Sequence, residues 1–134
     1  MAKKNLTARI ATLERQLAEV RVRAVDASEF RLVDKSGRVR AVFEMTRSGP
    51  RLAMMDEDGS VSLEATLTRD GPGIRLADAE GQTRLFVGAT RDEARIGLSD
   101  GQEKPRMFLG VSRSGKPKFT IYDAHQKKVW EAPR

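Results

Sequence analysis

Hydrophobic residues near the N-terminus recur at alternating spacings of four and three, the pattern of a coiled-coil seam. The seam positions are Leu6, Ile10, Leu13, Leu17, Val20 and Ala24. They predict an α-helix over about residues 5–26, with Thr7 as a candidate N-cap unless the helix begins at Asn5 or earlier. A seam this narrow favours an intermolecular coiled coil over a helix packed on its own domain. About three heptads are marginal alone, so further contacts must hold the chains together.

The remainder of the chain repeats with a period of 22 residues. Aspartates follow this period at Asp34, Asp56, Asp78 and Asp100, and Asp123 comes 23 residues after the last of them. Arginines keep it at Arg47, Arg69, Arg91 and Arg113. We therefore divide the chain into an oligomerisation helix, residues 1–28, and a repeat domain of about five units, residues 29–134.

Each repeat has the pattern of a β-hairpin. An alternating arm leads to a turn such as Asp34-Lys35-Ser36-Gly37, and a second alternating arm places Val39, Ala41, Phe43 and Met45 on one face. Asp in the first turn position and Gly in the fourth predict a type I turn with a G1 bulge. Two turns in each repeat predict roughly ten short antiparallel strands in a meander. The last two turns depart from the pattern, and Trp130 takes an apolar position where it is expected to pack inward.

One face of the predicted sheet is apolar and needs a second layer. Ten strands span about 48 Å, far more than one helix covers. Two solutions remain: an up-and-down β-barrel in one chain, or several chains that pack their apolar faces around a common axis as a β-prism. The prism is favoured because helix and sheets would share one axis, and three chains is the best estimate of their number.

This layout resembles trimeric fibre and stalk proteins, such as phage tail fibres and trimeric adhesin shafts, in which a short coiled coil leads into a β-rich trimer. The units Leu32–Arg40 and Leu76–Arg84 also resemble β-hairpin repeats of uncharacterised bacterial proteins. The resemblance concerns architecture along the whole chain, and it implies no particular site residues.

Composition narrows the function further. The 134 residues include no Cys, which excludes disulfides, thiol catalysis and Cys-ligated metals. The single histidine, His125, leaves no ordinary Ser-His or paired-His chemistry. We expect no cofactor, no metal and no catalytic residue. No apolar run reaches the length of a membrane span, and the N-terminus lacks a signal-peptide core. The expected location is therefore the cytoplasm, and secretion would require that a signal had been removed.

Two arginine columns are the candidate binding residues. The first is Arg47, Arg69, Arg91 and Arg113, which recurs about every 10 Å along one edge of the sheet. The second, on the polar face, is Arg40, Arg84 and Arg106. Either column could hold an acidic partner or phosphates, and the alternative is that these are solvated turn and strand residues.

Other candidates are weaker. The aspartates favour turn capping over Ca²⁺ binding, because most of the turns lack the further carboxylates that Ca²⁺ needs. Glu44 and Glu64 have no accompanying nucleophile or pocket, so an acid/base pair is not favoured. Phe86 and Phe108 could form a small exposed patch on the polar face.

We therefore expect a non-enzymatic homo-oligomer, a stalk or scaffold that docks a protein partner as yet unidentified. The alternative is a basic module for nucleic acid or another anionic polymer, which the net charge of +6 favours and the scarcity of aromatic residues opposes.

Overall fold

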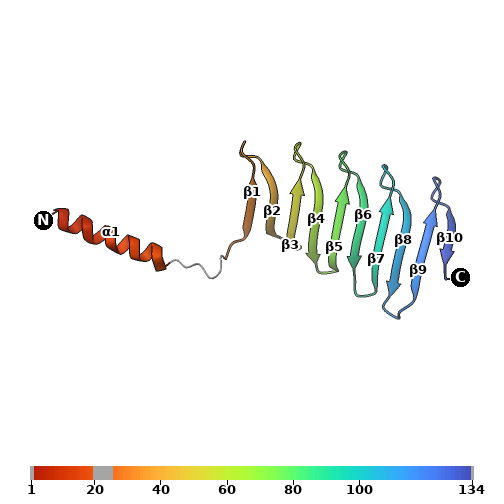
Figure 1. The fold of residues 1–134 in the computed structure, drawn as a ribbon. Coiled ribbons are helices and arrows are strands. Elements are labelled where there is room, and N and C mark those ends of the chain that lie inside the picture. The colour runs from red at the N-terminus through yellow and green to blue at the C-terminus, as the bar shows by residue number, and fades with distance from the viewer. Residues whose placement is uncertain (1, 20–25, 134) are drawn as a thin grey trace.

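A single helix precedes the repeats. The computed structural model describes residues 2–19 and 26–133, and within the helix it describes the side chains of residues 6–15. The helix, α1, spans Ala2–Glu19 and lies apart from the strands (Figure 1). It begins well before Thr7, so Thr7 is not the N-cap, and the alternative start at Asn5 or earlier is confirmed. The predicted end near residue 26 and the seam positions Val20 and Ala24 lie outside the described residues.

The repeats form ten antiparallel strands in one open sheet, as the alternating pattern predicted (Figure 1). The strands are β1 (Glu29–Val33), β2 (Val39–Thr46), β3 (Gly49–Met55), β4 (Val61–Thr68), β5 (Gly71–Ala77), β6 (Thr83–Ala89), β7 (Glu93–Ser99), β8 (Pro105–Ser112), β9 (Pro117–Tyr122) and β10 (Lys128–Ala132). They lie side by side in sequence order. A closed barrel would pair β1 with β10, whereas these are the two edges of the sheet, so the barrel alternative is not the fold of this chain.

The turns fall on two opposite rims of the sheet. We call upper rim the turns that join β1–β2, β3–β4, β5–β6, β7–β8 and β9–β10, and lower rim the turns that join β2–β3, β4–β5, β6–β7 and β8–β9 (Figure 1). Every upper-rim hairpin carries a shift in strand register next to its turn. The first three turns have a glycine at positive φ, as at Gly37 with φ 80°. This is the predicted type I turn with a left-handed fourth residue.

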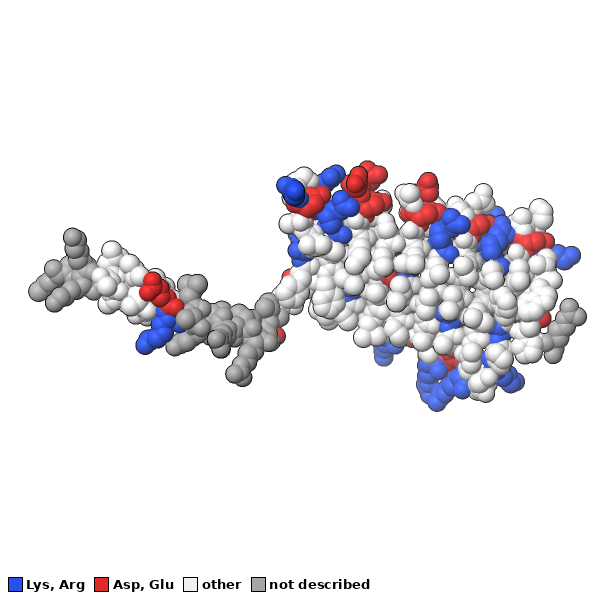
Figure 2. All heavy atoms as spheres, in the orientation of Figure 1, with Lys and Arg blue, Asp and Glu red and all other residues white. Residues whose placement is uncertain are grey.

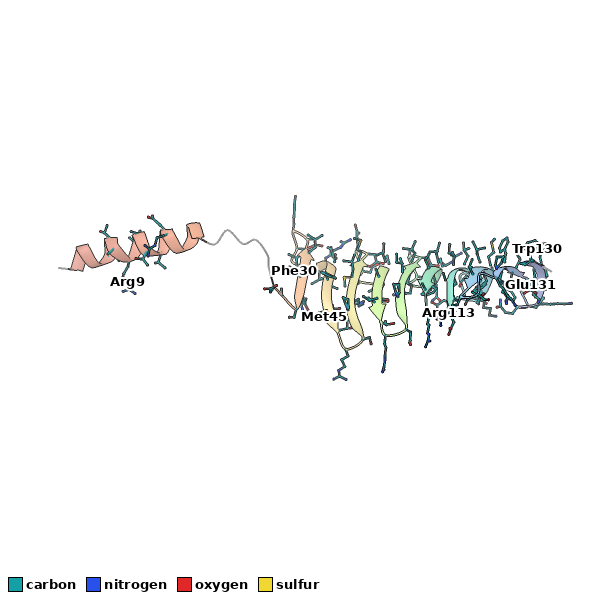
Figure 3. The ribbon with its side chains drawn as sticks, turned by 90° about the horizontal axis from the view of Figure 1, so that it is seen from below. Arg9, Phe30, Met45, Arg113, Trp130 and Glu131 are labelled. Atoms are coloured by element: carbon teal, nitrogen blue, oxygen red, sulfur yellow. The ribbon has the colours of Figure 1, made fainter. Side chains whose placement is uncertain are left out.

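Strand register sorts the side chains into two faces. On the apolar face, one row crosses all ten strands through Phe30, Phe43, Leu52, Ala65, Ile74, Val87, Ile96, Leu109, Phe119 and Ala132. A second row runs through Leu32, Ala41, Met54, Leu63, Leu76, Leu85, Leu98, Met107, Ile121 and Trp130. Trp130 and Glu131, adjacent in β10, lie on opposite sides of the sheet (Figure 3). The pattern thus predicted the faces correctly.

The chain by itself has almost no buried core. Among the described residues, the buried side chains are those of Val42, Ala53 and Thr120, and all three lie on the polar face. On this face the hydrogen-bonded side chains of Glu44, Arg51 and Glu64 come from the same strands as Val42 and Ala53 or from the strand beside them. The large apolar residues of the other face stay exposed, which is the reverse of an ordinary globular domain.

Candidate functional site

The main candidate site is the apolar face itself. Sixteen large hydrophobic side chains of the described strands are exposed, among them Leu32 at 65%, Met45 at 62% and Phe43 at 52% on this face. Figure 2 shows a broad face with almost no charged atoms between two charged rims. None of the described strands or α1 covers this face, because each strand contacts only its neighbours in the sheet.

The accessible surface shows how unusual this exposure is. The chain exposes 10903 Å², whereas a compact protein of 14.9 kDa exposes about 7,000 Å². A typical stable interface buries about 800 Å² on each partner. The excess, which includes the surface of the separate helix, is larger than the area that one standard interface covers on one partner.

The apolar face is hollowed in its middle. A depression of about 490 Å³ lies over β5–β8. Its lining includes Ile74, Val87, Ala89, Ala94, Leu109 and Val111. Ala89 and Ala94 pair with each other next to a lower turn, where the equivalent pair one repeat earlier is Leu67 with Pro72. The two small side chains leave room for a bulky apolar group, and no described residue of the same chain occupies this hollow.

The helix carries a second exposed apolar stripe. Leu6, Ile10 and Leu13 are exposed at 61%, 48% and 56%. They share one side of α1 because their spacing matches the helical period. The side chain of Leu17 and the residues Val20 and Ala24 lie outside the described residues.

Ion pairs link neighbouring strands on the polar face. Arg51 in β3 donates from Nη1 to Glu44 in β2 at 2.7 Å and from Nε to Glu64 in β4 at 2.5 Å. Arg75 in β5 donates to the other oxygen of Glu64 at 3.2 Å. These donors lower the pKa of Glu64, chiefly through the hydrogen bond from Arg51. Glu44 and Glu64 are thus bridged by an arginine and do not form an acid/base pair.

Two phenylalanines of the polar face lie over glycines. An added Cβ at Gly88 would come within 2.5 Å of the Phe86 ring, and one at Gly110 within 2.9 Å of the Phe108 ring. Arg95 lies 5.2 Å from the centroid of Phe86, and Lys118 lies 5.9 Å from that of Phe108. The rings are half-buried and each already has a cation beside it, so they do not form an open aromatic patch for bases.

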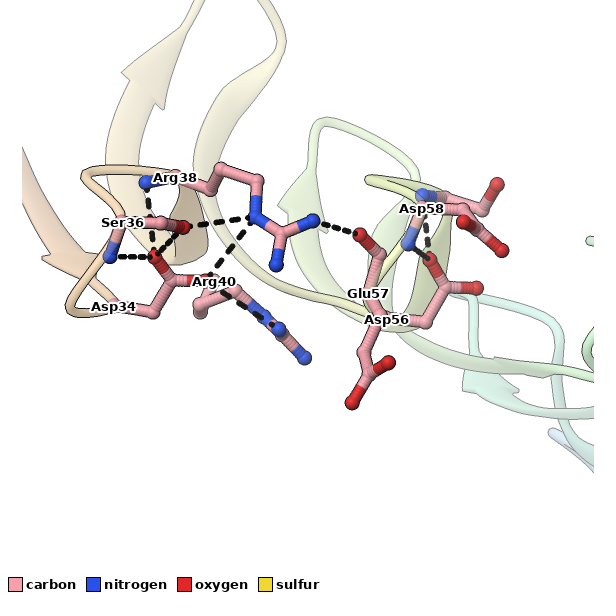
Figure 4. Close-up of polar contacts among 8 residues, drawn as sticks. Asp34, Ser36, Arg38, Arg40, Asp56, Glu57 and Asp58 are labelled. Atoms are coloured by element: carbon pink, nitrogen blue, oxygen red, sulfur yellow. Dashed lines mark hydrogen bonds and ion pairs between the residues drawn. The ribbon is translucent and has the colours of Figure 1, made fainter.

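The upper rim uses its aspartates to hold the turns. Asp34 Oδ1 accepts from the N–H groups of Ser36 and Arg38 at 2.9 and 3.1 Å, as Figure 4 shows beside the equivalent turn at Asp56. The Ser36 hydroxyl also donates to Asp34. This bond, with the two N–H donors, lowers the pKa of the Asp34 carboxyl to about 2. The predicted capping role of the aspartates is confirmed, because each of the five turns has the aspartate as a side-chain acceptor. No cluster of metal-ligating side chains occurs in residues 2–19 or 26–133.

The second arginine column belongs to these turns. Arg40 lies 3.6 Å from Asp34, Arg84 lies 3.2 Å from Asp78, and Arg106 pairs with Asp100. Each guanidinium therefore has the carboxylate of its own turn as a partner. This engagement favours the structural alternative for Arg40, Arg84 and Arg106.

The first arginine column lies on the lower rim. Arg47, Arg69, Arg91 and Arg113 are all exposed. Their guanidinium groups form no ion pair with any described residue, whereas the arginines of the second column each pair with an aspartate. Figure 2 shows blue atoms along this rim, and Figure 3 looks onto it with Arg113 labelled. Asp70 and Asp92 follow two of these arginines in the chain. The sequence thus located the column, and the structure separates it from the arginines already paired.

Sequence reasoning missed how the two atypical turns are held. Glu103 and Gln126 take the left-handed position that glycine takes in the first three turns, with φ 58° and 62°. Glu103 accepts a hydrogen bond from Thr83 N–H at 2.8 Å, and Gln126 donates to the carbonyl of Pro105 at 3.2 Å. Each side chain therefore ties its turn to the preceding repeat. The displaced Gly101 was the signal in the sequence that this turn differs.

Comparison with known proteins gives no relative from which a function could be transferred. No protein-family model matches the chain, and no curated protein matches it significantly. Among the described residues, no helix has the length and apolarity needed to cross a membrane. The function must therefore be inferred from the surfaces described above.

Proposed function

We propose that this chain is a non-enzymatic, homo-oligomeric structural or adaptor protein, in which identical sheets pack their apolar faces around a common axis. The observation that carries the proposal is the exposed apolar face, with two continuous rows of hydrophobic side chains across ten strands. Covering such a face is strongly favourable, at about 25 cal/mol for each Å² of apolar surface removed from water. A second copy of the same chain carries the same flat, aliphatic face, so it is a suitable cover.

The edges of the sheet support packing through faces. The two edge strands, β1 and β10, have five residues each and carry charged side chains such as Arg31 and Glu131. Short, charged edges disfavour the addition of further strands. Growth of the assembly by edge-to-edge pairing is thus opposed, while the apolar face remains open.

The helix supports a parallel arrangement. An exposed stripe at Leu6, Ile10 and Leu13 suits a short coiled coil formed by residues 1–28. Parallel helices at one end require an axis that runs along the direction in which the strands are stacked. Three chains would close a triangular prism on that axis, with the hollow near Ala89 and Ala94 turned toward the other chains. The partner that such a stalk or scaffold docks is a protein as yet unidentified.

The mass of the full chain in solution tests this proposal. We expect a concentration-dependent oligomer, with about 45 kDa for a trimer, three times the 14.9 kDa chain. Sedimentation equilibrium over a range of concentrations measures it. A strictly monomeric chain at all concentrations would contradict the proposal.

A second candidate function rests on the lower-rim arginines. Arg47, Arg69, Arg91 and Arg113 have exposed guanidinium groups without an ion pair among the described residues, and they recur about every 10 Å. Such a column could bind nucleic acid or another anionic polymer. Titration with a polyanion over a salt series tests this, because phosphate contacts weaken steeply as salt rises. Absence of salt-sensitive binding at about 50 mM salt would exclude it.

A further inference from the structure

The lower-rim arginines have a more specific partner than an anionic polymer. We infer that Arg69 and Arg91 form ion pairs with the upper-rim carboxylates Glu57, Asp58 and Glu80 of a neighbouring copy of this chain. This inference rests on the proposed function, because it needs copies that are arranged around the strand-stacking direction. It places the arginine column where the lower rim of one sheet meets the upper rim of the next, which we call the corners of the assembly.

Symmetry brings the two rims together. When identical sheets are related by rotation about the stacking direction, the lower rim of one sheet meets the upper rim of the next. In a ring of three chains this contact is head-to-tail, and in a twofold pair the same two rims meet twice across an isologous interface. A closed ring also allows no shift along its axis, so repeats of neighbouring copies meet at matched levels.

The rims interdigitate at these levels. Upper turns follow β1, β3, β5, β7 and β9, while lower turns follow β2, β4, β6 and β8. Each set recurs every two strands, about 9.6 Å, and the two sets are offset by one strand, about 4.8 Å. A lower turn of one copy therefore fits between two upper turns of its neighbour.

The charges match at the middle levels. The lower turn with Arg69 falls between the upper turns that carry Glu57 with Asp58 and Glu80. The lower turn with Arg91 falls between Glu80 and the turn at residues 100–103. All three carboxylates are exposed, and the described residues offer none of them an ion pair. The arginines of the upper rim, in contrast, are paired within their own chain, as Arg84 is with Asp78.

One feature disfavours an anionic polymer on the same column. The aromatic rings that could stack on bases, Phe86 and Phe108, are folded over glycines on the polar face, and each already has a cation beside it. A neighbouring copy presents separate carboxylates at the spacing of the arginines, which fits the column better.

Charge reversal with rescue tests the inference on the full chain. Arg69→Glu with Arg91→Glu should weaken self-association at least about tenfold, and so should Glu57→Arg with Glu80→Arg, because each places like charges at every corner. All four changes together restore opposite charges at positions 57, 69, 80 and 91, with Asp58 left unchanged, and should recover most of the lost affinity. Sedimentation equilibrium measures the affinities, and far-UV circular dichroism checks that each variant folds.

A matched control carries the same change in net charge elsewhere. Arg31→Glu with Lys118→Glu alters two exposed cationic side chains of the polar face, which is turned away from the proposed axis, and should leave the affinity nearly unchanged. A second measurement needs no variant: the affinity of the unmodified chain should fall as salt rises from about 50 to about 500 mM.

The outcomes separate this inference from the proposed function. An unmodified chain that is monomeric overturns both. An oligomer whose affinity is the same for the Arg69/Arg91 variant and for the control overturns the corner contacts alone, as does failure of the fourfold variant to recover when it is folded. If that Arg69/Arg91 variant instead loses binding to a polyanion while its self-association is intact, the column belongs to an anionic polymer.

Discussion

Replacing Ile74 by Asp places a carboxylate in the middle of the apolar face. Ile74 lies in β5 between Ala65 and Val87 of the neighbouring strands, beside the hollow, and is 45% exposed in the single chain. In one chain the new carboxylate can therefore reach water. In an assembly that packs these faces together it would be buried without a partner, so the change should separate folding from association.

The magnitude follows from the exposed fraction. Full burial of an isoleucine contributes about 1.5–3 kcal/mol, so covering the 45% of Ile74 that the chain leaves exposed contributes about 0.7–1.4 kcal/mol for each copy. Ile74→Ala should lose most of this, roughly a threefold to tenfold weakening for each copy. Ile74→Asp adds the desolvation of an unpaired carboxylate, several kcal/mol, and should weaken association by more than about 100-fold.

Sedimentation equilibrium on the full chain compares Ile74→Asp with Thr66→Asp. Thr66 lies on the polar face of β4 opposite Arg51, so its replacement adds the same charge on the other side of the sheet. We expect Thr66→Asp to associate like the unmodified chain and Ile74→Asp to sediment as a folded monomer. If Ile74→Asp associates as strongly as Thr66→Asp, the apolar face is not the interface and the reasoning is refuted.

Three further predictions concern the sheet itself and use urea unfolding followed by circular dichroism or carboxyl NMR titration. Gly71→Ala should lower the free energy of unfolding by more than about 2 kcal/mol, because φ is 131° and the new Cβ would lie 1.9 Å from the Ala89 carbonyl oxygen, whereas Gly97→Ala, where nothing lies within 4 Å, should change it little. Glu64→Gln should lower it by about 1–2 kcal/mol, because two arginines lose their shared carboxylate at a half-buried position, and an unchanged midpoint would contradict the role of this network. The Asp34 carboxyl should titrate with a pKa of about 2, below its unfolded value near 3.9. Its contribution to the free energy of unfolding is therefore complete above about pH 4 and disappears as pH falls through 2. A titration near 3.9 would show that the serine hydroxyl and the N–H donors do not stabilise the carboxylate.

The local elements were predictable because their signals are local. Alternation of apolar and polar residues, with an Asp and a Gly at fixed places in the first three turns, predicted the strands, the turn type and the faces, and the register agrees along the whole sheet. The sequence left two helix starts open, and the structure decides for the earlier one, because the residues from Ala2 onward are as helix-compatible as those after Thr7.

Side-chain partners between strands could not be read from the sequence. Arg51 bridges Glu44 of β2 and Glu64 of β4, which belong to different turns of the chain. Only the register of the strands decides which of these charges become neighbours. The pairing of Arg40 with Asp34 is, in contrast, local to one hairpin, and the same spacing recurs in the pairs of Arg84 with Asp78 and Arg106 with Asp100.

By itself, then, the sequence determined a one-faced apolar meander of 22-residue hairpins behind a short amphipathic helix. The tertiary structure decided that this sheet stays open and that nothing in the described part of the chain covers its apolar face. The physical reason is that hydrogen bonding between adjacent strands is satisfied locally, repeat by repeat, whereas burial of the face depends on a second layer. That layer is absent from residues 2–19 and 26–133 of the single chain, and we propose that further copies provide it.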